Sequence, residues 1–145
     1  MKIVLQRVLE AEIAVDSQKI AQIGKGLLVF LGITTSDTET IVKTMVDKIS
    51  RLRIFADDDG KSNLSINDIG GEILIVSQFT LYADTRKGNR PSFIEAAQPQ
   101  HANAMYECFI EYCRGKFAKV EAGIFAADMK VRLINDGPYT IVMNS

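Results

Sequence analysis

The chain has 145 residues, of which 47% are hydrophobic and 24% charged, and its formal net charge is −1. This length and balance are typical of one compact globular domain covering residues 1–145, with a core large enough to fold without disulfides or metals. The near-neutral charge excludes a general electrostatic attraction to nucleic acids or anionic membranes. Any contact with RNA must therefore rest on a local basic patch.

The two cysteines, Cys108 and Cys113, do not form a disulfide framework, because five positions on a helix separate them by about 140° around its axis. They indicate reduced thiols of a cytosolic protein. Residues 1–15 lack the zones of a signal peptide, and the longest apolar run, residues 26–33, is too short to span a bilayer. We therefore expect a cytoplasmic protein without a membrane partner.

Strands and one helix are predicted in the first part of the chain. Residues 2–15 interleave apolar and polar side chains like a long strand, residues 20–23 form its hairpin partner, and residues 26–32 form a strand buried on both faces. Apolar residues then recur at helical spacing over residues 41–52. Residues 36–39 have the pattern of a capping box before this helix.

The second part predicts a strand over residues 72–82 and a helix that begins near Pro99 and ends at Gly115. Three short strands follow, near Val120, Val131 and Ile141. A turn at residues 135–138 separates the last two strands. This order of elements predicts an α/β domain with a mixed sheet and two main flanking helices.

Two features that resemble functional sites are set aside. Residues 57–60 resemble a calcium loop in composition, but setting Gly60 at the sixth loop position puts Phe55 where a carboxylate is required, so a solvated turn is favoured. His101 has no adjacent serine or thiol pattern that would form a catalytic triad. One histidine and two unsuitably spaced cysteines also argue against zinc, so we expect no metal and no organic cofactor.

The most informative stretch is Ser77-Gln78-Phe79-Thr80-Leu81, where polar side chains end an apolar strand. They either satisfy backbone groups at the edge of the sheet or contribute to a binding site. A basic cluster follows within ten residues, formed by Arg86, Lys87 and Arg90. Such a cluster is usually a solvated loop, but beside a polar strand end it is a candidate phosphate contact.

A second polar motif is Asn135-Asp136-Gly137-Pro138-Tyr139-Thr140. It is either a tight hairpin or a rigid element, because the peptide bond before proline is the one for which the cis form costs only about 0.5–1 kcal/mol. A cis Gly-Pro unit would fix a carbonyl in an unusual direction. Carbonyls fixed in this way are suited to rejecting ligands by shape.

These two motifs, together with Gln6-Arg7-Val8 near the start, resemble in order and position the D-aminoacyl-tRNA deacylase family. The resemblance covers essentially the whole chain. It implies a homodimer with a barrel-like sheet and an active site at the subunit interface, where the 3′ end of an aminoacylated tRNA enters. We expect no DNA among the binding partners.

The resemblance also assigns residues. Ser77, Gln78, Phe79 and Thr80 would form the pocket for the terminal adenosine and the ester. The phosphate contact already expected from the charges of Arg86, Lys87 and Arg90 would then be a contact with tRNA. Gly137 and Pro138 would be the Gly-cisPro element inserted from the partner subunit, held by Arg7. Tyr139 departs from the family pattern, which more often has a smaller apolar residue at this position.

The implied function is hydrolysis of the ester bond of D-aminoacyl-tRNA. If the Gly137 and Pro138 carbonyls hold the amino group, an L side chain strikes the rigid turn, whereas a D side chain or glycine does not. Thr80 has no base in its motif, so backbone N–H groups near Phe79 and Thr80 are expected to bind the oxyanion, with assistance from the tRNA ribose hydroxyl.

Two other functions remain open from the sequence. One is a module that binds tRNA 3′ ends without chemistry, for which the near-neutral charge is unfavourable. The other is a hydrolase of small D-amino acid esters, for which the basic cluster at residues 86–90 would have no purpose.

Overall fold

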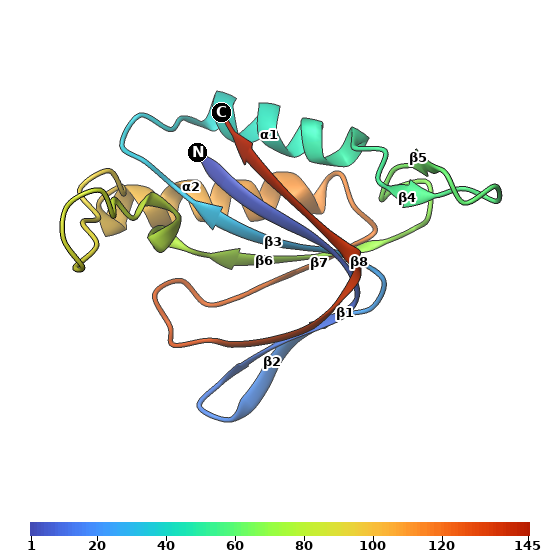
Figure 1. Cartoon of the computed structure of the whole chain (residues 1–145), viewed down its shortest axis with the longest axis horizontal. Helices are drawn as coiled ribbons and strands as arrows, with labels where there is room; N and C mark the ends of the chain where they lie inside the picture. The colour runs from blue at the N-terminus through green and yellow to red at the C-terminus, as the bar shows by residue number, and fades with distance from the viewer.

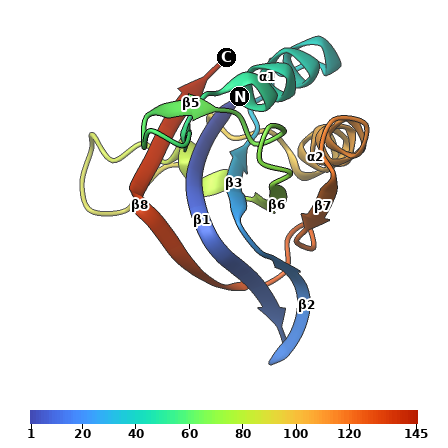
Figure 2. The same ribbon diagram turned by 90° about the vertical axis from the view of Figure 1, so that its right-hand side faces the viewer.

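The structure is a computed structural model that describes all 145 residues. A strongly curved, barrel-like sheet carries two helices on one face (Figures 1 and 2). The elements, in chain order, are β1 (Lys2–Val15), β2 (Gln18–Ile23), β3 (Gly26–Gly32), α1 (Glu39–Arg51), β4 (Phe55–Ala56), β5 (Ser62–Leu64), β6 (Glu72–Ser77), the 3₁₀ helix η1 (Phe79–Tyr82), α2 (Pro99–Arg114), β7 (Lys119–Ala122) and β8 (Lys130–Asn144). This confirms the predicted mixed α/β class with two main helices.

Strand β1 organises the sheet because it pairs along both of its edges. On one edge its first half, residues 2–8, is antiparallel to β3 and its second half, residues 11–15, is antiparallel to β2. On the other edge it pairs with β8 over nearly its whole length. Strands β3, β6 and β7 are parallel neighbours, so α1 and α2 lie in the crossover connections between them.

The core has two parts, one on each face of β3 and β6. The larger part lies between the sheet and the helices and includes Leu5, Val29, Ile75 and Phe109. The smaller part lies on the opposite face, where β2 and the first half of β8 curve away from the helices (Figure 2). None of the helices is long and apolar enough to cross a membrane.

The expected capping box before α1 is wrong. The N-cap is Thr38, whose side chain accepts a hydrogen bond from the N–H of Ile41, and Glu39 is the first helical residue. Asp37 is instead buried, pairs with the amino group of Met1 and accepts a hydrogen bond from the N–H of Thr34. The helix therefore begins two residues later than the capping-box pattern, with Ser36 as its cap, would place it.

The expected strand over residues 72–82 is too long. Strand β6 ends at Ser77, and the next residues turn into η1. Figure 1 also shows a short hairpin, β4 and β5, that the sequence did not indicate. The acidic stretch before β5 is a turn, in which the Asp57 carboxylate accepts hydrogen bonds from the N–H groups of Asp59 and Lys61.

The expected turn between two C-terminal strands is also wrong. Residues 130–144 form one long strand, β8, and Gly137 and Pro138 lie inside it. The pairing of β8 with β1 shifts on both sides of Val8, so the strand continues past an irregular segment instead of reversing. The strand folds sharply in Figure 1, yet its two halves continue along one partner.

Candidate active site

The end of β6 is fixed by backbone contacts with β3. Ser77 pairs with Leu31, and the N–H of Gln78 donates to the Leu31 carbonyl at 2.8 Å. The chain then packs η1 directly on Gly32, where an added Cβ would lie 3.0 Å from the Leu81 Cβ and 3.2 Å from the Gln78 carbonyl oxygen. The polar motif is therefore held against the sheet by its main chain.

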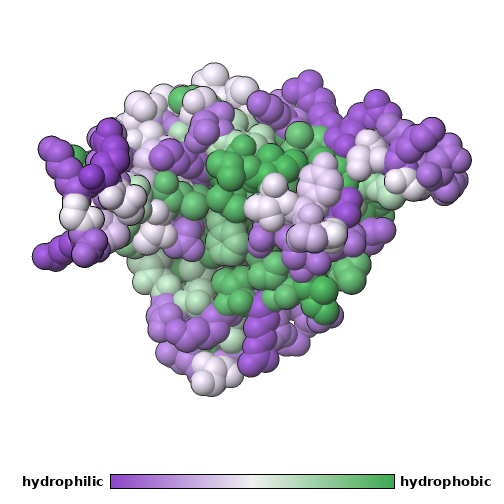
Figure 3. Space-filling view, in the orientation of Figure 1, coloured by the Kyte–Doolittle hydropathy of each residue, from purple (hydrophilic) through white to green (hydrophobic).

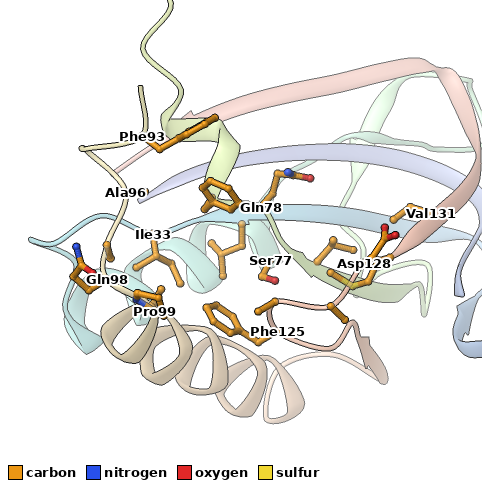
Figure 4. Close-up of a pocket in the computed structure, with 18 residues that line it drawn as sticks. Ile33, Ser77, Gln78, Phe93, Ala96, Gln98, Pro99, Phe125, Asp128 and Val131 are labelled. Atoms are coloured by element: carbon orange, nitrogen blue, oxygen red, sulfur yellow. The ribbon is translucent and has the colours of Figure 1, made fainter. Parts of the chain in front are cut away.

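This strand end forms one wall of a cavity of about 570 Å³. Figure 4 shows Ser77 facing its middle, with Phe125 on the side of α2 and Phe93 at the opposite rim. The cavity is lined by Leu31, Ile33, Val76, Ser77, Gln78, Phe79, Phe93, Ala96, Ala97, Gln98, Pro99, Ala102, Phe125, Ala126, Ala127, Asp128, Met129 and Val131. It is mostly apolar with a few polar side chains, the usual character of a small-molecule site.

Three of the four predicted pocket residues, Ser77, Gln78 and Phe79, line this cavity, and Thr80 does not. The Thr80 hydroxyl oxygen accepts a hydrogen bond from the Gln78 side-chain amide. Phe79 is exposed and meets Phe93 edge to face, with ring centroids 5.0 Å apart. The motif thus gives the cavity two polar side chains and an aromatic rim.

The cavity lining holds one charged residue, Asp128, whose exposed carboxylate is paired with Lys130 at 2.8 Å. No lining residue is a histidine, lysine or cysteine, and the molecule has no group of three potential metal ligands. His101 lies outside the lining, and its Nε2 is 3.0 Å from the Asp37 carbonyl oxygen. Besides main-chain groups, the cavity thus offers the hydroxyl of Ser77, the side-chain amides of Gln78 and Gln98 and the paired carboxylate of Asp128.

Gly137 and Pro138 are not part of this cavity. Both are exposed, the peptide bond between them is cis, and Gly137 has φ +147°. Arg7 on β1 holds the residue before them: its Nε donates to the Asp136 carbonyl at 2.9 Å, and its Nη1 donates to the Ile54 carbonyl at 2.6 Å. The two predicted halves of the site are therefore not brought together within one chain.

The basic cluster lies on a loop that projects beyond the end of the sheet, in yellow in Figure 1. Two backbone hydrogen bonds between Asp84 and Ser92 close this loop. Arg86 lies 2.7 Å from the Asp84 carboxylate, and this hydrogen bond lowers the pKa of Asp84 to about 2. Lys87 and Arg90 form no ion pair, so they carry the uncompensated positive charge of the loop.

Several cavity residues were missed from the sequence. The segment from Phe125 to Met129 forms a wall, with Ala126 at φ +62°. The first turn of α2 supplies Pro99 and Ala102. Apart from Asp128, these side chains are apolar and carry no chemical signal, so only the fold identifies them.

Comparisons with known proteins give the class. A family model described as D-Tyr-tRNA(Tyr) deacylase matches residues 4–144. Proteins named D-aminoacyl-tRNA deacylase from Thermotoga petrophila and Clostridioides difficile are 54% and 53% identical over 145 residues, covering 100% of this chain and 97% of each relative. The chain is therefore an enzyme of the hydrolase class.

Solved structures agree in fold. One titled c-Myc DNA Unwinding Element Binding Protein is 42% identical with a TM-score of 0.95, covering 100% of this chain and 99% of that one. Another, of a probable eukaryotic D-amino acid tRNA deacylase, is 16% identical with a TM-score of 0.87, covering 98% and 97%. The chain belongs to the D-Tyr-tRNA(Tyr) deacylase family, which confirms the resemblance seen in its motifs.

Proposed function

We propose that this protein hydrolyses the ester bond of D-aminoacyl-tRNA and of glycyl-tRNA in the cytoplasm, and rejects L-aminoacyl-tRNA. The observation that carries the proposal is the polar end of β6, Ser77 and Gln78, set in the wall of an apolar cavity of about 570 Å³. A cavity of this size accepts a terminal nucleoside with its aminoacyl group. Family membership supports the same substrate class.

The proposal includes a homodimer in which the partner subunit supplies the Gly137–Pro138 element. In each chain this element is exposed and lies outside the chain's own cavity. A dimer that exchanges it would complete both sites by the same symmetric contact. A single chain, by contrast, would have a cavity without its chiral filter.

An apolar row on the sheet face opposite the helices supports this dimer. Register aligns Val142, Val4 and Phe30 on neighbouring strands, and all three retain exposed surface. Figure 3 shows apolar side chains gathered on this side of the molecule. Exposed apolar surface of this kind marks protein interfaces, and a second copy is the occupant that also completes the cavity. Sedimentation of the wild type and of Val142→Asp tests it, with a monomeric wild type as the contrary result.

Chiral selection follows from the fixed backbone of this element. If the Gly137 and Pro138 carbonyls hold the amino group of the substrate, the handedness of the α-carbon decides where the side chain points. A D side chain points to open space, an L side chain meets the main chain, and glycine presents nothing to reject. The filter acts by exclusion, so it needs no pocket matched to each amino acid.

For the chemistry, we propose that main-chain N–H groups of Phe79 and Thr80 stabilise the oxyanion. They belong to the first turn of η1, where no preceding helical carbonyl is available to them. Thr80 is a poor nucleophile here, because its oxygen already accepts a hydrogen bond from Gln78 and no base contacts it. The tRNA ribose hydroxyl beside the ester then assists the attack of water on the ester carbonyl.

Thr80→Ala tests this assignment. We expect turnover of D-aminoacyl-tRNA to fall by about tenfold or less, the effect of losing one supporting hydrogen bond. Complete loss of turnover with unchanged tRNA binding would instead identify Thr80 as the nucleophile. A substrate that lacks the neighbouring ribose hydroxyl serves as the complementary test, and it should be cleaved far more slowly.

The central experiment measures release of D-tyrosine and L-tyrosine from charged tRNA by purified protein without added metal. Release of the D form alone is the expected result. Binding of tRNA without release would favour a non-catalytic module, and equal activity on a small D-tyrosine ester would favour a small-molecule hydrolase. Release of both forms would contradict the chiral filter.

A further inference from the structure

The backbone around Gly137 and Pro138 is not held by the sheet. On β1, Gln6 pairs with Thr140 and Val8 pairs with Asn135, so a single β1 residue lies opposite the four residues between them on β8. Ladder hydrogen bonds therefore stop on both sides of the Gly-Pro unit. Side chains must hold this segment in place of the regular pairing.

One of these side chains is Asn135, which spans the segment from end to end. Its Oδ1 accepts the N–H of Tyr139 at 2.6 Å, and its Nδ2 donates to the Tyr139 carbonyl at 3.2 Å. The same Nδ2 lies 3.4 Å from the Thr140 hydroxyl. A single amide thus satisfies both main-chain groups of the residue that follows Pro138.

Arg7 ties the other end of the segment. Its Nε binds the carbonyl of Asp136 and lies 3.3 Å from the Asp136 carboxylate, and its guanidinium stacks 4.7 Å from the ring centroid of Tyr139. The Arg7 contacts fix Asp136 and the Tyr139 ring, and they leave the Tyr139 main chain to Asn135. The two side chains hold different groups, so neither replaces the other.

We infer that Asn135 is a positioning residue for chiral discrimination, which fixes the direction of the Gly137 and Pro138 carbonyls through the main chain of Tyr139. This inference rests on the proposed function. An N–H group without a partner is costly, so removing the Asn135 side chain leaves Tyr139 free to exchange its hydrogen bond for one with water. The carbonyls then lose a fixed direction, and the exclusion of L substrates weakens.

The test compares Asn135→Ala and Asn135→Asp with the wild type. The aspartate keeps an oxygen that accepts the Tyr139 N–H, whereas alanine keeps neither contact. We expect Asn135→Ala to speed hydrogen exchange of the Tyr139 amide and to lower the ratio of D-tyrosine to L-tyrosine release by about tenfold, the factor that corresponds to ~1.4 kcal/mol. Asn135→Asp should retain most of both properties.

Asn63→Ala is the matched control, because Asn63 also makes side-chain amide contacts, with Asp57 and Arg53 in the β4–β5 hairpin, and lines no cavity. It should leave the D/L ratio unchanged. Thermal unfolding establishes that each variant is folded, and Asn135→Ser replaces the alanine variant if that one is not. A purely structural role would lower stability without moving the ratio.

An unchanged D/L ratio in Asn135→Ala, with wild-type enzyme that discriminates, overturns the inference. A lower ratio that aspartate does not rescue overturns it too, because the Tyr139 N–H contact would not be the cause. A wild type that releases neither amino acid contradicts the proposed function instead. Hydrogen exchange of the Tyr139 amide can be measured even if the wild type is inactive, and an unchanged exchange rate in Asn135→Ala would overturn the inference.

Discussion

The two motifs that carry the proposed site are held in opposite ways. Residues 77–80 are fixed by main-chain contacts to β3 and by close packing on Gly32, inside the wall of the cavity. Gly137 and Pro138 are exposed, and side chains of Arg7 and Asn135 hold the segment that contains them. Residues 77–79 thus line the cavity of their own chain, whereas Gly137 and Pro138 lie at the surface, outside that cavity.

The largest effect is expected when the packing of the first region is disturbed. In Gly32→Ala, the new Cβ would lie 3.0 Å from the Leu81 Cβ and 3.2 Å from the Gln78 carbonyl, so η1 must move. We expect a loss of about 2 kcal/mol in the free energy of unfolding, as for other overpacked sites, and a larger loss of turnover than of tRNA binding. Chemical denaturation and single-turnover kinetics measure the two.

Gly115→Ala is the control for this variant, because its Cβ meets only the Tyr112 carbonyl at an ordinary 3.6 Å. It should leave stability and turnover nearly unchanged. If Gly32→Ala loses stability but keeps full turnover, the position of η1 does not matter for the chemistry, and the main-chain account of the first region is wrong.

Substitutions in the second region should change the selectivity for D over L substrates more than the stability of the fold. In Gly137→Ala, φ of +147° is unfavourable for alanine, and the Cβ would lie 2.9 Å from the Tyr139 nitrogen. We expect the ratio of D-tyrosine to L-tyrosine release to fall by about tenfold, equivalent to ~1.4 kcal/mol. Gly70→Ala serves as a control, because Gly70 also has a positive φ, +59°, but an added Cβ there has no neighbour within 4 Å, so this variant should leave the ratio unchanged.

Substitutions in the basic loop test whether tRNA binds beside the cavity formed by the first region. Replacing Lys87 and Arg90 with alanine should lower kcat/KM on charged tRNA by about three- to tenfold and reduce its dependence on salt, because these two charges have no ionic partner. Arg86→Ala should do less, since Asp84 already compensates its charge. Equal effects on a small ester substrate would argue against a tRNA contact.

The smallest effect is expected at Glu72, which begins β6 at the end remote from Ser77. The N–H of Gly24 and then Lys119 lower the pKa of Glu72, so its contribution to stability is present above its ordinary value of 4.5 and is lost as pH falls. Glu72→Gln should cost less than about 1 kcal/mol at pH 7, and the difference from wild type should shrink as pH falls below the ordinary pKa of Glu72. Unfolding curves against pH test this, with the D/L ratio at pH 7 unchanged.

Many of the helices and strands could be predicted from the sequence, because hydrophobic periodicity depends only on residues that are close along the chain. The bounds of β1 and β3 and the extent of α2 from Pro99 to Gly115 agree with the patterns. The identity of the family was legible as well, because its motifs consist of polar residues that interrupt apolar elements. The same polar interruption of an apolar strand predicted the pocket residues, of which Ser77, Gln78 and Phe79 line the cavity.

Tertiary contacts decided the rest. Asp37 pairs with the distant amino group of Met1, and the cap of α1 is Thr38 instead of the predicted Ser36. Residues 130–144 form one strand because β1 is long enough to pair with both halves. The cavity wall at residues 125–129 is apolar apart from Asp128, and no local rule places it beside Ser77. The sequence by itself determined most of the segments that form helices and strands, and the polar motifs that mark the family. Only the folded chain decided which of them meet, because that depends on contacts between residues far apart along it.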